Sequence, residues 1–523
     1  MATDVQFAIS RIASINPATG EVLGDLESAG PAEVHAAVAR ARSAQHDWNG
    51  WGIRNRIAVL CRFQQILLAR KADIARRITQ EAGKPVVEAL TTEVLVVLDT
   101  ARFLIENGYA LLRPERLPHG NLAMKTKSGE ILREPYGVIG IISPWNYPFS
   151  IPATETMAAL VAGNAVVLKP SELTPLIALE LRKMLVEAGV PEEIVQVLPG
   201  EGATGAALVS SEIDKLVFTG SVATGRRIAQ IAAERLLPVV LELGGKDPML
   251  VLDDADIDVA SSGAVWGAFV NAGQTCLSVE RCYVHRSLYA AFVDICAEKA
   301  RKLRVGNGMD DATEIGPMIH ERQVRIVESH VEDACERGAR VLAGGTRLRE
   351  LGPTFFAPTV LADVTRDMRV MQEETFGPIL PIAPFDDDAE AVAFANDSEY
   401  GLAASVWTRD RARGERMARQ IKAGTVMVND AVSCFGISEA PHGGVKLSGV
   451  GRTHGRWGVE EMVRVKHVDS DRLPRMKKMW WFGYGREFTA EMESFLDLLY
   501  ARPLREKMKA AVRSAGALWR RKL

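Results

Sequence analysis

The chain has 523 residues, of which 47% are hydrophobic and 25% charged, and its formal net charge is -3 at pH 7. This composition is typical of a globular protein in water, and the length exceeds that of one domain, so we expect at least two domains. The nearly balanced charge gives no large field of one sign, which argues against nucleic acid as the main partner.

The cysteines and the chain's first residues bear on its compartment. Six cysteines are scattered along the chain without a C-x-x-C pair or a dense secreted-type framework, which predicts a reduced, cytoplasmic setting. The first fourteen residues lack an apolar core followed by a cleavage site, so we expect no secretory signal. The most apolar stretch, residues 138–168, is interrupted by three prolines and Glu155, and we interpret it as buried core rather than a membrane span.

The first part of the chain predicts a long helix followed by a parallel sheet. Apolar residues at helical spacing predict an amphipathic helix over residues 54–82, closed by Gly83 and Pro85. Short β-branched runs then alternate with segments of helical length, which predicts βαβ units with helices on both faces. The runs are residues 138–142, 165–168, 194–198, 216–218 and 238–241. Ligands of such sheets bind at the carboxyl ends of the strands.

A second α/β region is predicted over residues 244–440. It contains an amphipathic helix at residues 319–336 and strand-like runs at residues 378–383, 404–407 and 425–429. Two α/β lobes therefore follow one another, and the crevice between them is the expected site. From Asp471 to Leu523 the chain changes character, with 13 Lys and Arg against 6 Asp and Glu.

Two motifs offer a nucleophile and a base, namely NAGQTC, which ends at Cys276, and LELGGK, which contains Glu242. A cysteine attacks as the thiolate, which needs an activating setting because the ordinary thiol pKa is about 8.5. Glu242 ends a predicted strand, where a carboxylate would face a ligand. Taken alone, each residue is better explained as a buried structural cysteine or an ordinary strand-end carboxylate.

The loop SPWNYP, residues 143–148, holds Asn146 just after a predicted buried strand. An amide there could donate a hydrogen bond to a developing oxyanion, and one such donor is typically worth about 2.7–4 kcal/mol. The alternative is a turn asparagine that bonds its own backbone.

Two further loops suit a dinucleotide. KPSE, residues 169–172, and FTGSVATG, residues 218–225, follow predicted strands, and in the second Gly220 and Gly225 permit close approach of the backbone at a helix N-terminus. The spacing is not G-x-G-x-x-G, so the glycine pattern by itself is weak. Glu172 could accept hydrogen bonds from an adenosine ribose and would repel a 2′-phosphate, which favours NAD over NADP.

These motifs together resemble the aldehyde dehydrogenase superfamily. The resemblance runs from about Ile15 (INPATGEVLG) to about Val468, with SPWNYP, KPSE, FTGS, LELGGK, GQTC, EETFGP and PHGGVKLSGVGR in that family's order. It implies an α/β fold with a Rossmann-like parallel-sheet cofactor domain, an α/β catalytic domain and a small β oligomerisation element, hence a homodimer or homotetramer. The implied bounds are residues 1–116 and 134–243, residues 244–440, and residues 117–133 with 455–470, followed by an extension over residues 471–523.

The resemblance implies a reaction and a role for each matching residue. The reaction is NAD-dependent oxidation of an aldehyde to a carboxylic acid, without a metal, through a thiohemiacetal and a thioester. Cys276 matches the nucleophile, Glu242 the base that activates water, and Asn146 the oxyanion donor that works with the backbone N–H of Cys276. The expected cofactor contacts are Trp145, Lys169, Glu172, Gly220, Ser221, Gly225, Glu374 and Phe376. NADP remains the less favoured cofactor.

Some positions depart from the family or do not identify the substrate. His442 stands where the commoner family form has Phe, and we expect a solvated loop histidine rather than a catalytic group. Leu277 and Phe435 are expected to line the substrate channel without naming the aldehyde. The tail exceeds the usual end of the family and is faintly similar to extended plant and fungal members.

Aromatic and basic residues alternate in this tail, where Trp480, Trp481 and Phe482 follow basic residues and a basic amphipathic segment runs from about Phe488 to Leu523. Peripheral contact with an anionic membrane is one interpretation. Packing of the tail's apolar side chains on the protein's own surface or on another subunit is favoured, because apolar helix faces usually pack on protein.

Three other functions remain open. A CoA-acylating dehydrogenase shares the fold and the cysteine but typically lacks the base, so Glu242 argues against it. A cysteine hydrolase needs a histidine base, and no histidine stands in a recognised motif with Cys276. A noncatalytic member would be expected to have lost some of Cys276, Glu242 and Asn146, and all three are present.

Overall fold

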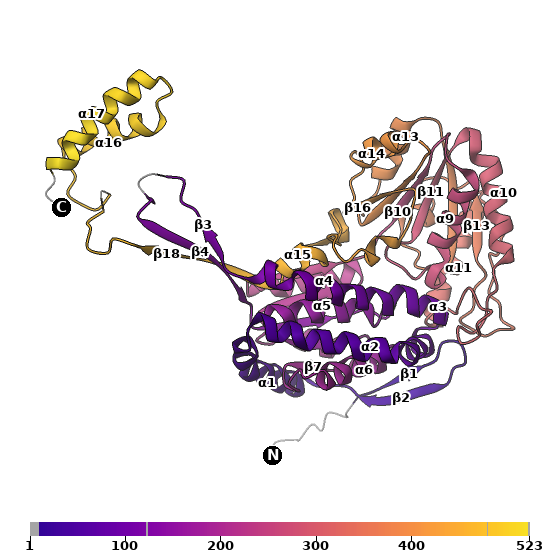
Figure 1. The fold of residues 1–523 in the computed structure, drawn as a ribbon. Helices are drawn as coiled ribbons and strands as arrows, with labels where there is room; N and C mark the ends of the chain where they lie inside the picture. Colours follow the sequence, from indigo (N-terminus) through magenta and orange to yellow (C-terminus); the bar gives the residue numbers. More distant parts are fainter. Residues whose placement is uncertain (1–9, 122–123, 479, 521–523) are drawn as a thin grey trace, which may run out of the picture. The chain divides into compact units, whose positions relative to one another are not determined.

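The computed structural model describes residues 10–121, 124–478 and 480–520, so the predictions for residues 1–9, 122–123, 479 and 521–523 lie outside it. The chain forms two compact units, which Figure 1 draws as ribbons. The first unit consists of Met1–Leu112 and Pro135–Arg464, and the second of Arg113–Glu134 and Val465–Leu523.

The first unit begins with a β-hairpin and a layer of long helices. The predicted amphipathic helix is confirmed as α2, Gly52–Ala82, which ends where Gly83 adopts a left-handed backbone conformation with φ of 84°. The other elements before the first sheet are β1 (Arg11–Ile15), β2 (Val22–Glu27), α1 (Pro31–Gly50), α3 (Val86–Glu88), the π-helix η1 (Ala89–Val94) and α4 (Leu95–Leu112).

A six-stranded sheet follows, with the order β17-β9-β8-β5-β6-β7. Its five predicted strands are confirmed to within two residues and all run parallel, while the edge strand β17 is antiparallel. The strands are β5 (Val138–Ile142), β6 (Ala165–Lys169), β7 (Val195–Val197), β8 (Lys215–Thr219), β9 (Val239–Glu242) and β17 (Gly449–Val450). The chain reverses direction across the sheet between β5 and β8, where α/β sheets bind ligands.

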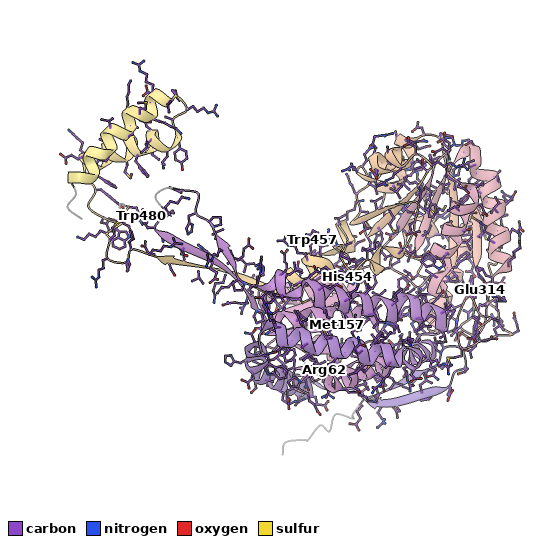
Figure 2. The ribbon with its side chains drawn as sticks, viewed as in Figure 1. Arg62, Met157, Glu314, His454, Trp457 and Trp480 are labelled. Carbon is purple, nitrogen blue, oxygen red and sulfur yellow. The ribbon has the colours of Figure 1, made fainter. Side chains whose placement is uncertain are left out.

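The helices of this lobe cover the sheet and complete its core. They are α5 (Ser150–Ala162), α6 (Pro175–Glu187), α7 (Gly202–Ser210), α8 (Val222–Glu234) and α15 (Gly455–Glu460). Every residue of α5 is buried, including Met157, which is labelled in Figure 2. The prediction of buried core over residues 138–168 is therefore confirmed, and no helix of the described residues is long and apolar enough to cross a membrane.

The second lobe is a seven-stranded sheet with the order β12-β13-β14-β11-β10-β15-β16, parallel except for β12. The strands are β10 (Asp247–Val251), β11 (Val279–His285), β12 (Arg340–Ala343), β13 (Thr359–Ala362), β14 (Ile379–Phe385), β15 (Ala403–Trp407) and β16 (Thr425–Val428). The last three match the predicted runs, whereas β10 to β13 were not predicted.

Helices and short 3-10 turns connect these strands. They are α9 (Ile257–Phe269), η3 (Val270–Gly273), α10 (Arg286–Lys302), α11 (Glu321–Glu336), α12 (Arg369–Gln372), α13 (Asp388–Asn396), α14 (Arg411–Ala418), η4 (Ser433–Gly436) and η5 (Lys446–Ser448). The helix predicted over residues 319–336 is confirmed as α11. Each lobe has its own apolar core, and both lobes lie in the first unit.

The second unit contains a small sheet and a helical hairpin. The sheet has the order β18-β4-β3, made from β3 (Glu115–Leu117), β4 (Lys127–Pro135) and β18 (Val463–Asp471). This is the small β element predicted from the sequence. The tail forms α16 (Arg486–Tyr500) and α17 (Leu504–Arg520), which pack on each other, with Ser494 of α16 donating a hydrogen bond to the Ala510 carbonyl at 3.4 Å.

Candidate active site

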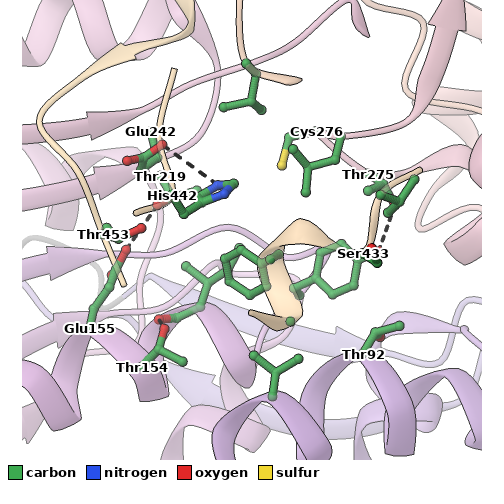
Figure 3. Close-up of a pocket in the computed structure, with 18 of the residues that line it drawn as sticks. Thr92, Thr154, Glu155, Thr219, Glu242, Thr275, Cys276, Ser433, His442 and Thr453 are labelled. Carbon is green, nitrogen blue, oxygen red and sulfur yellow. Dashed lines mark hydrogen bonds and ion pairs between the residues drawn. The ribbon is translucent and has the colours of Figure 1, made fainter. Parts of the chain in front are cut away.

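Two cavities of the first unit meet at Cys276. We call them the apolar cavity, of about 300 Å³, and the second cavity, of about 370 Å³. Both are lined by Ile151, Thr219, Glu242, Leu243 and Cys276. Figure 3 shows the apolar cavity, with the sulfur of Cys276 directed towards its open centre. A cysteine between two cavities can react with a molecule in one while a second molecule occupies the other.

Cys276 lies in a loop between η3 and β11, just after a strained stretch of backbone. Asn271 and Ala272 have φ of 55° and 53°, and Gly273 has φ of 72°. Non-glycine residues in this left-handed region persist only where the surroundings hold them, and such strain clusters at functional sites. Here the half-buried Glu88 carboxylate accepts a 3.0 Å hydrogen bond from the Asn271 backbone N–H.

Asn146 lies in the loop after β5 and is tied directly to the cysteine loop. Its side-chain amide donates to the Gln274 carbonyl at 3.0 Å, and its own carbonyl accepts a hydrogen bond from the side chain of Asn271 at 3.0 Å. One of the two amide hydrogens of Asn146 is used in this way, which leaves the second for another acceptor.

A fully buried ion pair supports the loop that carries Asn146. The ammonium of Lys84 lies 2.8 Å from Glu93, donates to the Asn146 carbonyl at 2.8 Å, and lies 3.8 Å from the centre of the Tyr147 ring. Glu93 in turn accepts hydrogen bonds from the backbone N–H groups of residues 149 and 150, at the start of α5. Neither Lys84 nor Glu93 was predicted from the sequence, because nothing in its pattern marks an isolated Lys as buried.

Glu242 stands at the carboxyl end of β9, as predicted, and faces both cavities. Its carboxyl is buried, and neither oxygen has a hydrogen-bond partner among the described residues. Burial, followed by the nearby carboxyl of Glu155, raises the pKa of Glu242 well above its ordinary value. Burial likewise raises the pKa of the Cys276 thiol, and the neighbouring carboxyl groups of Asp247, Glu374 and Glu242 add to this shift. Both groups therefore favour their neutral forms.

The expectation for His442 is wrong. Its side chain is 6% exposed and lines the apolar cavity, with the imidazole 4.0 Å from the Glu242 carboxyl, as the dashed line in Figure 3 shows. The ring packs edge-on against Phe435, with centroids 5.0 Å apart, and lies near a second buried histidine, His454, labelled in Figure 2. Burial lowers the pKa of His442 to about 3, so the imidazole is neutral. The segment that carries His442 is held beside β9 because the edge strand β17 pairs with β9, and the local sequence does not reveal this pairing.

The structure brings most of the predicted cofactor residues together. Those that line the second cavity are Trp145, Gly220, Ser221, Glu374 and Phe376. The rings of Trp145 and Phe376 meet edge-on with centroids 5.5 Å apart, and Glu374 accepts a 2.9 Å hydrogen bond from the Gly245 N–H. Burial raises the pKa of Glu374 to about 8.

Three predicted cofactor residues do not line this cavity. Lys169 ends β6 and Glu172 follows it, with the two side chains 3.3 Å apart. The charge of Glu172 acts on the pKa of His320, which does line the cavity. Gly225 packs against Leu243, whose side chain a Cβ would approach to 2.6 Å. His320 and Gln323 line the cavity but were not predicted, because they lie at the start of α11, far along the chain.

The fold and the two cavities define a two-lobed α/β enzyme with a cysteine at its centre. The model of the aldehyde dehydrogenase family matches residues 5–468, and the chain belongs to this family of NAD(P)-dependent aldehyde oxidoreductases. The same match supports the resemblance inferred from the motifs.

Three similar proteins illustrate the relationship. A 4,4'-diapolycopene aldehyde oxidase from Methylomonas sp is 39% identical over 492 residues, which cover 94% of this chain and 92% of the relative. A putative succinate-semialdehyde dehydrogenase (NADP(+)) from Mycolicibacterium smegmatis is 39% identical over 456 residues, 87% of this chain and 88% of the relative. The NAD+ complex of an aldehyde dehydrogenase from Bacillus cereus superposes with a TM-score of 0.85 at 37% identity, covering 88% of this chain and 93% of that one.

We expect Lys84→Met to destabilise the protein and to lower its activity. Removing the ammonium leaves buried carboxyl groups without a cation, which typically costs about 3–5 kcal/mol, and it removes one support of Asn146. Denaturant unfolding and kcat measure the two effects. The double variant Lys84→Met with Glu93→Gln should recover more stability than activity, because it removes the unpaired charge without restoring the bond to Asn146. A loss below about 1 kcal/mol in Lys84→Met would contradict this role.

Proposed function

We propose that this chain oxidises an aldehyde to a carboxylic acid with NAD as the preferred cofactor, through a covalent bond to Cys276. The observation that carries the proposal is the position of Cys276 between two cavities, beside Glu242 and Asn146. The balanced reaction is one aldehyde, one water and one NAD+ giving one carboxylate, one NADH and two protons.

The second cavity suits a dinucleotide by its chemistry. Ser221 caps the N-terminus of α8, where backbone N–H groups favour a pyrophosphate, and Glu374 can bond ribose hydroxyls. Trp145 and Phe376 offer aromatic faces for a planar ring. When bound, the oxidised nicotinamide supplies a positive charge and the hydride acceptor that converts a thiohemiacetal to a thioester.

The chain's own residues account for attack on the aldehyde. Burial favours the neutral thiol, so the thiolate of Cys276 forms when its charge is compensated or when a base takes the proton. When Glu242 is ionised, its raised pKa makes it a stronger base towards the thiol proton than an ordinary carboxylate. The second amide hydrogen of Asn146 and the backbone N–H of Cys276 then donate to the oxyanion that develops on the aldehyde oxygen.

Glu242 also serves the second half of the reaction. Its oxygens have no partner among the described residues, so they are available to bind a water molecule and to take its proton as it attacks the thioester. The neutral imidazole of His442, 4.0 Å away, adds a polar group beside this water. The presence of Glu242 favours hydrolysis of the thioester over its transfer to CoA.

Replacing the two central residues should separate the two halves of the reaction. Cys276→Ala should lower NADH formation by at least about 1000-fold, because it removes the thiol that makes the covalent bond. Glu242→Gln keeps the shape but not the base, so an initial burst of NADH should persist while steady turnover falls by about 10²- to 10⁴-fold. Stopped-flow absorbance of NADH measures both. Turnover of Cys276→Ala within tenfold of the parent would exclude the assignment, and a rate that rises with added CoA would favour the acylating alternative.

Cofactor preference should depend on Glu172. Its carboxylate at the end of β6 would repel the 2′-phosphate of NADP, so kcat/KM should be higher with NAD. Glu172→Gln should lower the ratio of kcat/KM with NAD to kcat/KM with NADP by about tenfold, because it removes one unfavourable charge contact with the 2′-phosphate. Initial rates with each cofactor at saturating aldehyde give the ratio, and Glu336→Gln, an exposed change on α11, serves as the control. Equal efficiency of the parent with both cofactors would contradict the role of Glu172.

The second unit suits a role in assembly. Its three-stranded sheet corresponds to the oligomerisation element that the family resemblance implies, and α17 exposes an apolar stripe at helical spacing formed by Leu504, Met508 and Val512, each at least 63% exposed. Apolar helix faces of this kind usually pack on protein, so we infer that another subunit covers the stripe. An anionic membrane is the alternative, favoured by the basic residues and by Trp481 and Phe482, which are exposed.

Truncation after Asp471 should distinguish these two partners. It removes the hairpin but keeps β18, so oxidation of a water-soluble aldehyde should persist while the oligomeric mass falls. Light scattering after size exclusion measures the mass, and co-sedimentation with anionic vesicles at low salt measures membrane binding. If truncation leaves the oligomeric mass unchanged but abolishes vesicle binding, the hairpin binds a membrane and not another subunit.

A further inference from the structure

Beyond the reacting centre, the walls of the apolar cavity are made mostly of hydrocarbon and aromatic side chains. Thr91, Thr92 and Val96 come from η1 and α4, and Trp266, Leu277, Leu402, Val432 and Phe435 come from the second lobe. Trp266 is 46% exposed, whereas Leu277 is 4% exposed beside Cys276, so the apolar wall extends from the cysteine to solvent. Such a wall gains free energy by covering an apolar substrate.

This cavity has no cation for an anionic substrate. Among the described residues that line it there is no Lys and no Arg, and its ionisable groups besides Cys276 and Tyr147 are Glu155, Glu242 and the neutral His442. The two carboxyl groups have raised pKa values, about 8 for Glu155, so each is neutral or negative but never positive. A substrate carboxylate placed here would lose its hydration without gaining a counter-charge, which is costly.

Among the described residues, five of the eight hydroxyl groups that line the cavity already donate their protons within the protein. Thr91 and Thr92 donate to the carbonyls of residues 87 and 88, at 2.8 and 2.7 Å, and Thr154 donates to the Ile151 carbonyl at 3.0 Å. At the other wall, Thr219 donates to Glu155 at 3.2 Å and Ser433 donates to Asp430 at 2.5 Å. A hydroxyl has one proton to donate, so these five present only acceptor lone pairs to the cavity. A carboxylate is itself an acceptor and cannot bond to them.

From these observations we propose that the enzyme selects uncharged, apolar aldehydes and rejects aldehydes that carry a carboxylate. The inference rests on the proposed function, since it concerns the aldehyde that reaches Cys276. The selection works in two ways: the hydrocarbon wall stabilises an apolar chain, and the absence of a Lys or Arg from the described lining disfavours an anionic end. This distinguishes the chain's substrate from succinate semialdehyde, after which several similar proteins are named.

A matched pair of substrates tests the inference with the full-length enzyme. Pentanal and succinate semialdehyde have similar length and differ mainly in the carboxylate, so we expect kcat/KM to be higher for pentanal by about 100-fold or more. From butanal to hexanal kcat/KM should rise by about fourfold per methylene, which corresponds to burial of one CH₂ group. NADH absorbance measures all of these rates. Equal or better use of succinate semialdehyde would overturn the inference and leave the proposed oxidation standing, whereas inactivity with every aldehyde would overturn the proposed function.

A pair of variants at Gly436 tests the physical reason. Gly436 lines the cavity near its exposed side, its φ is not positive, and a Cβ added there meets no atom within 4 Å. Gly436→Arg therefore adds a cation without strain, and Gly436→Met adds a side chain of comparable reach without charge. We expect Gly436→Arg to exceed Gly436→Met by about tenfold in kcat/KM for succinate semialdehyde and to match it for pentanal. No gain for the anionic substrate, or an equal gain for both, would contradict the charge-based selection.

Discussion

The active site depends on one buried charge, the ammonium of Lys84. Its burial lowers its pKa, and the carboxyl groups of Glu93 and Glu88 oppose this shift. The same two carboxyl groups are bound elsewhere, since Glu93 accepts from the start of α5 and Glu88 accepts from Asn271. One cation therefore fixes the loop that carries Asn146 and, through Glu88, the strained loop that leads to Cys276. An unpaired charge in this position would be far more costly than the pair, which makes the geometry rigid.

This rigid structure positions reactive groups whose environment does not stabilise their charged forms. Glu242 has two unpartnered oxygens among the described residues, and the pKa values of Glu242 and Cys276 are both raised by burial. Such groups are unfavourable for stability, and they are tolerated where the surrounding structure is well packed. Their protonation then responds to whatever charge enters the two cavities, which suits groups that exchange protons during a reaction.

The two sides of Cys276 differ in chemistry. The second cavity presents a helix N-terminus, Ser221 and Glu374, whereas the apolar cavity presents hydrocarbon and hydroxyl groups, of which Thr91 and Thr92 already donate their protons. Polar recognition is therefore concentrated on the side that suits a dinucleotide, and the other side discriminates by its apolar wall and by the lack of Lys and Arg among its described residues. Specificity of this kind depends as much on the groups that are absent from the lining as on the groups that are present.

The sequence by itself determined the parallel sheet, α2, α11 and the positions of Cys276, Glu242 and Asn146 at strand ends or in loops, because buried strands and long amphipathic helices leave local patterns of apolar residues. It did not determine β10 to β13, since short apolar strands beside glycine-rich loops are not distinguishable from core helix segments. Only the tertiary structure showed that Lys84 is buried, that His442 lies beside Glu242 rather than in solvent, and that five hydroxyls of the apolar cavity already donate their protons. Each of these depends on contacts between segments far apart in the chain, such as Lys84 with Asn146 and β17 with β9, and such contacts have no signature in the local sequence.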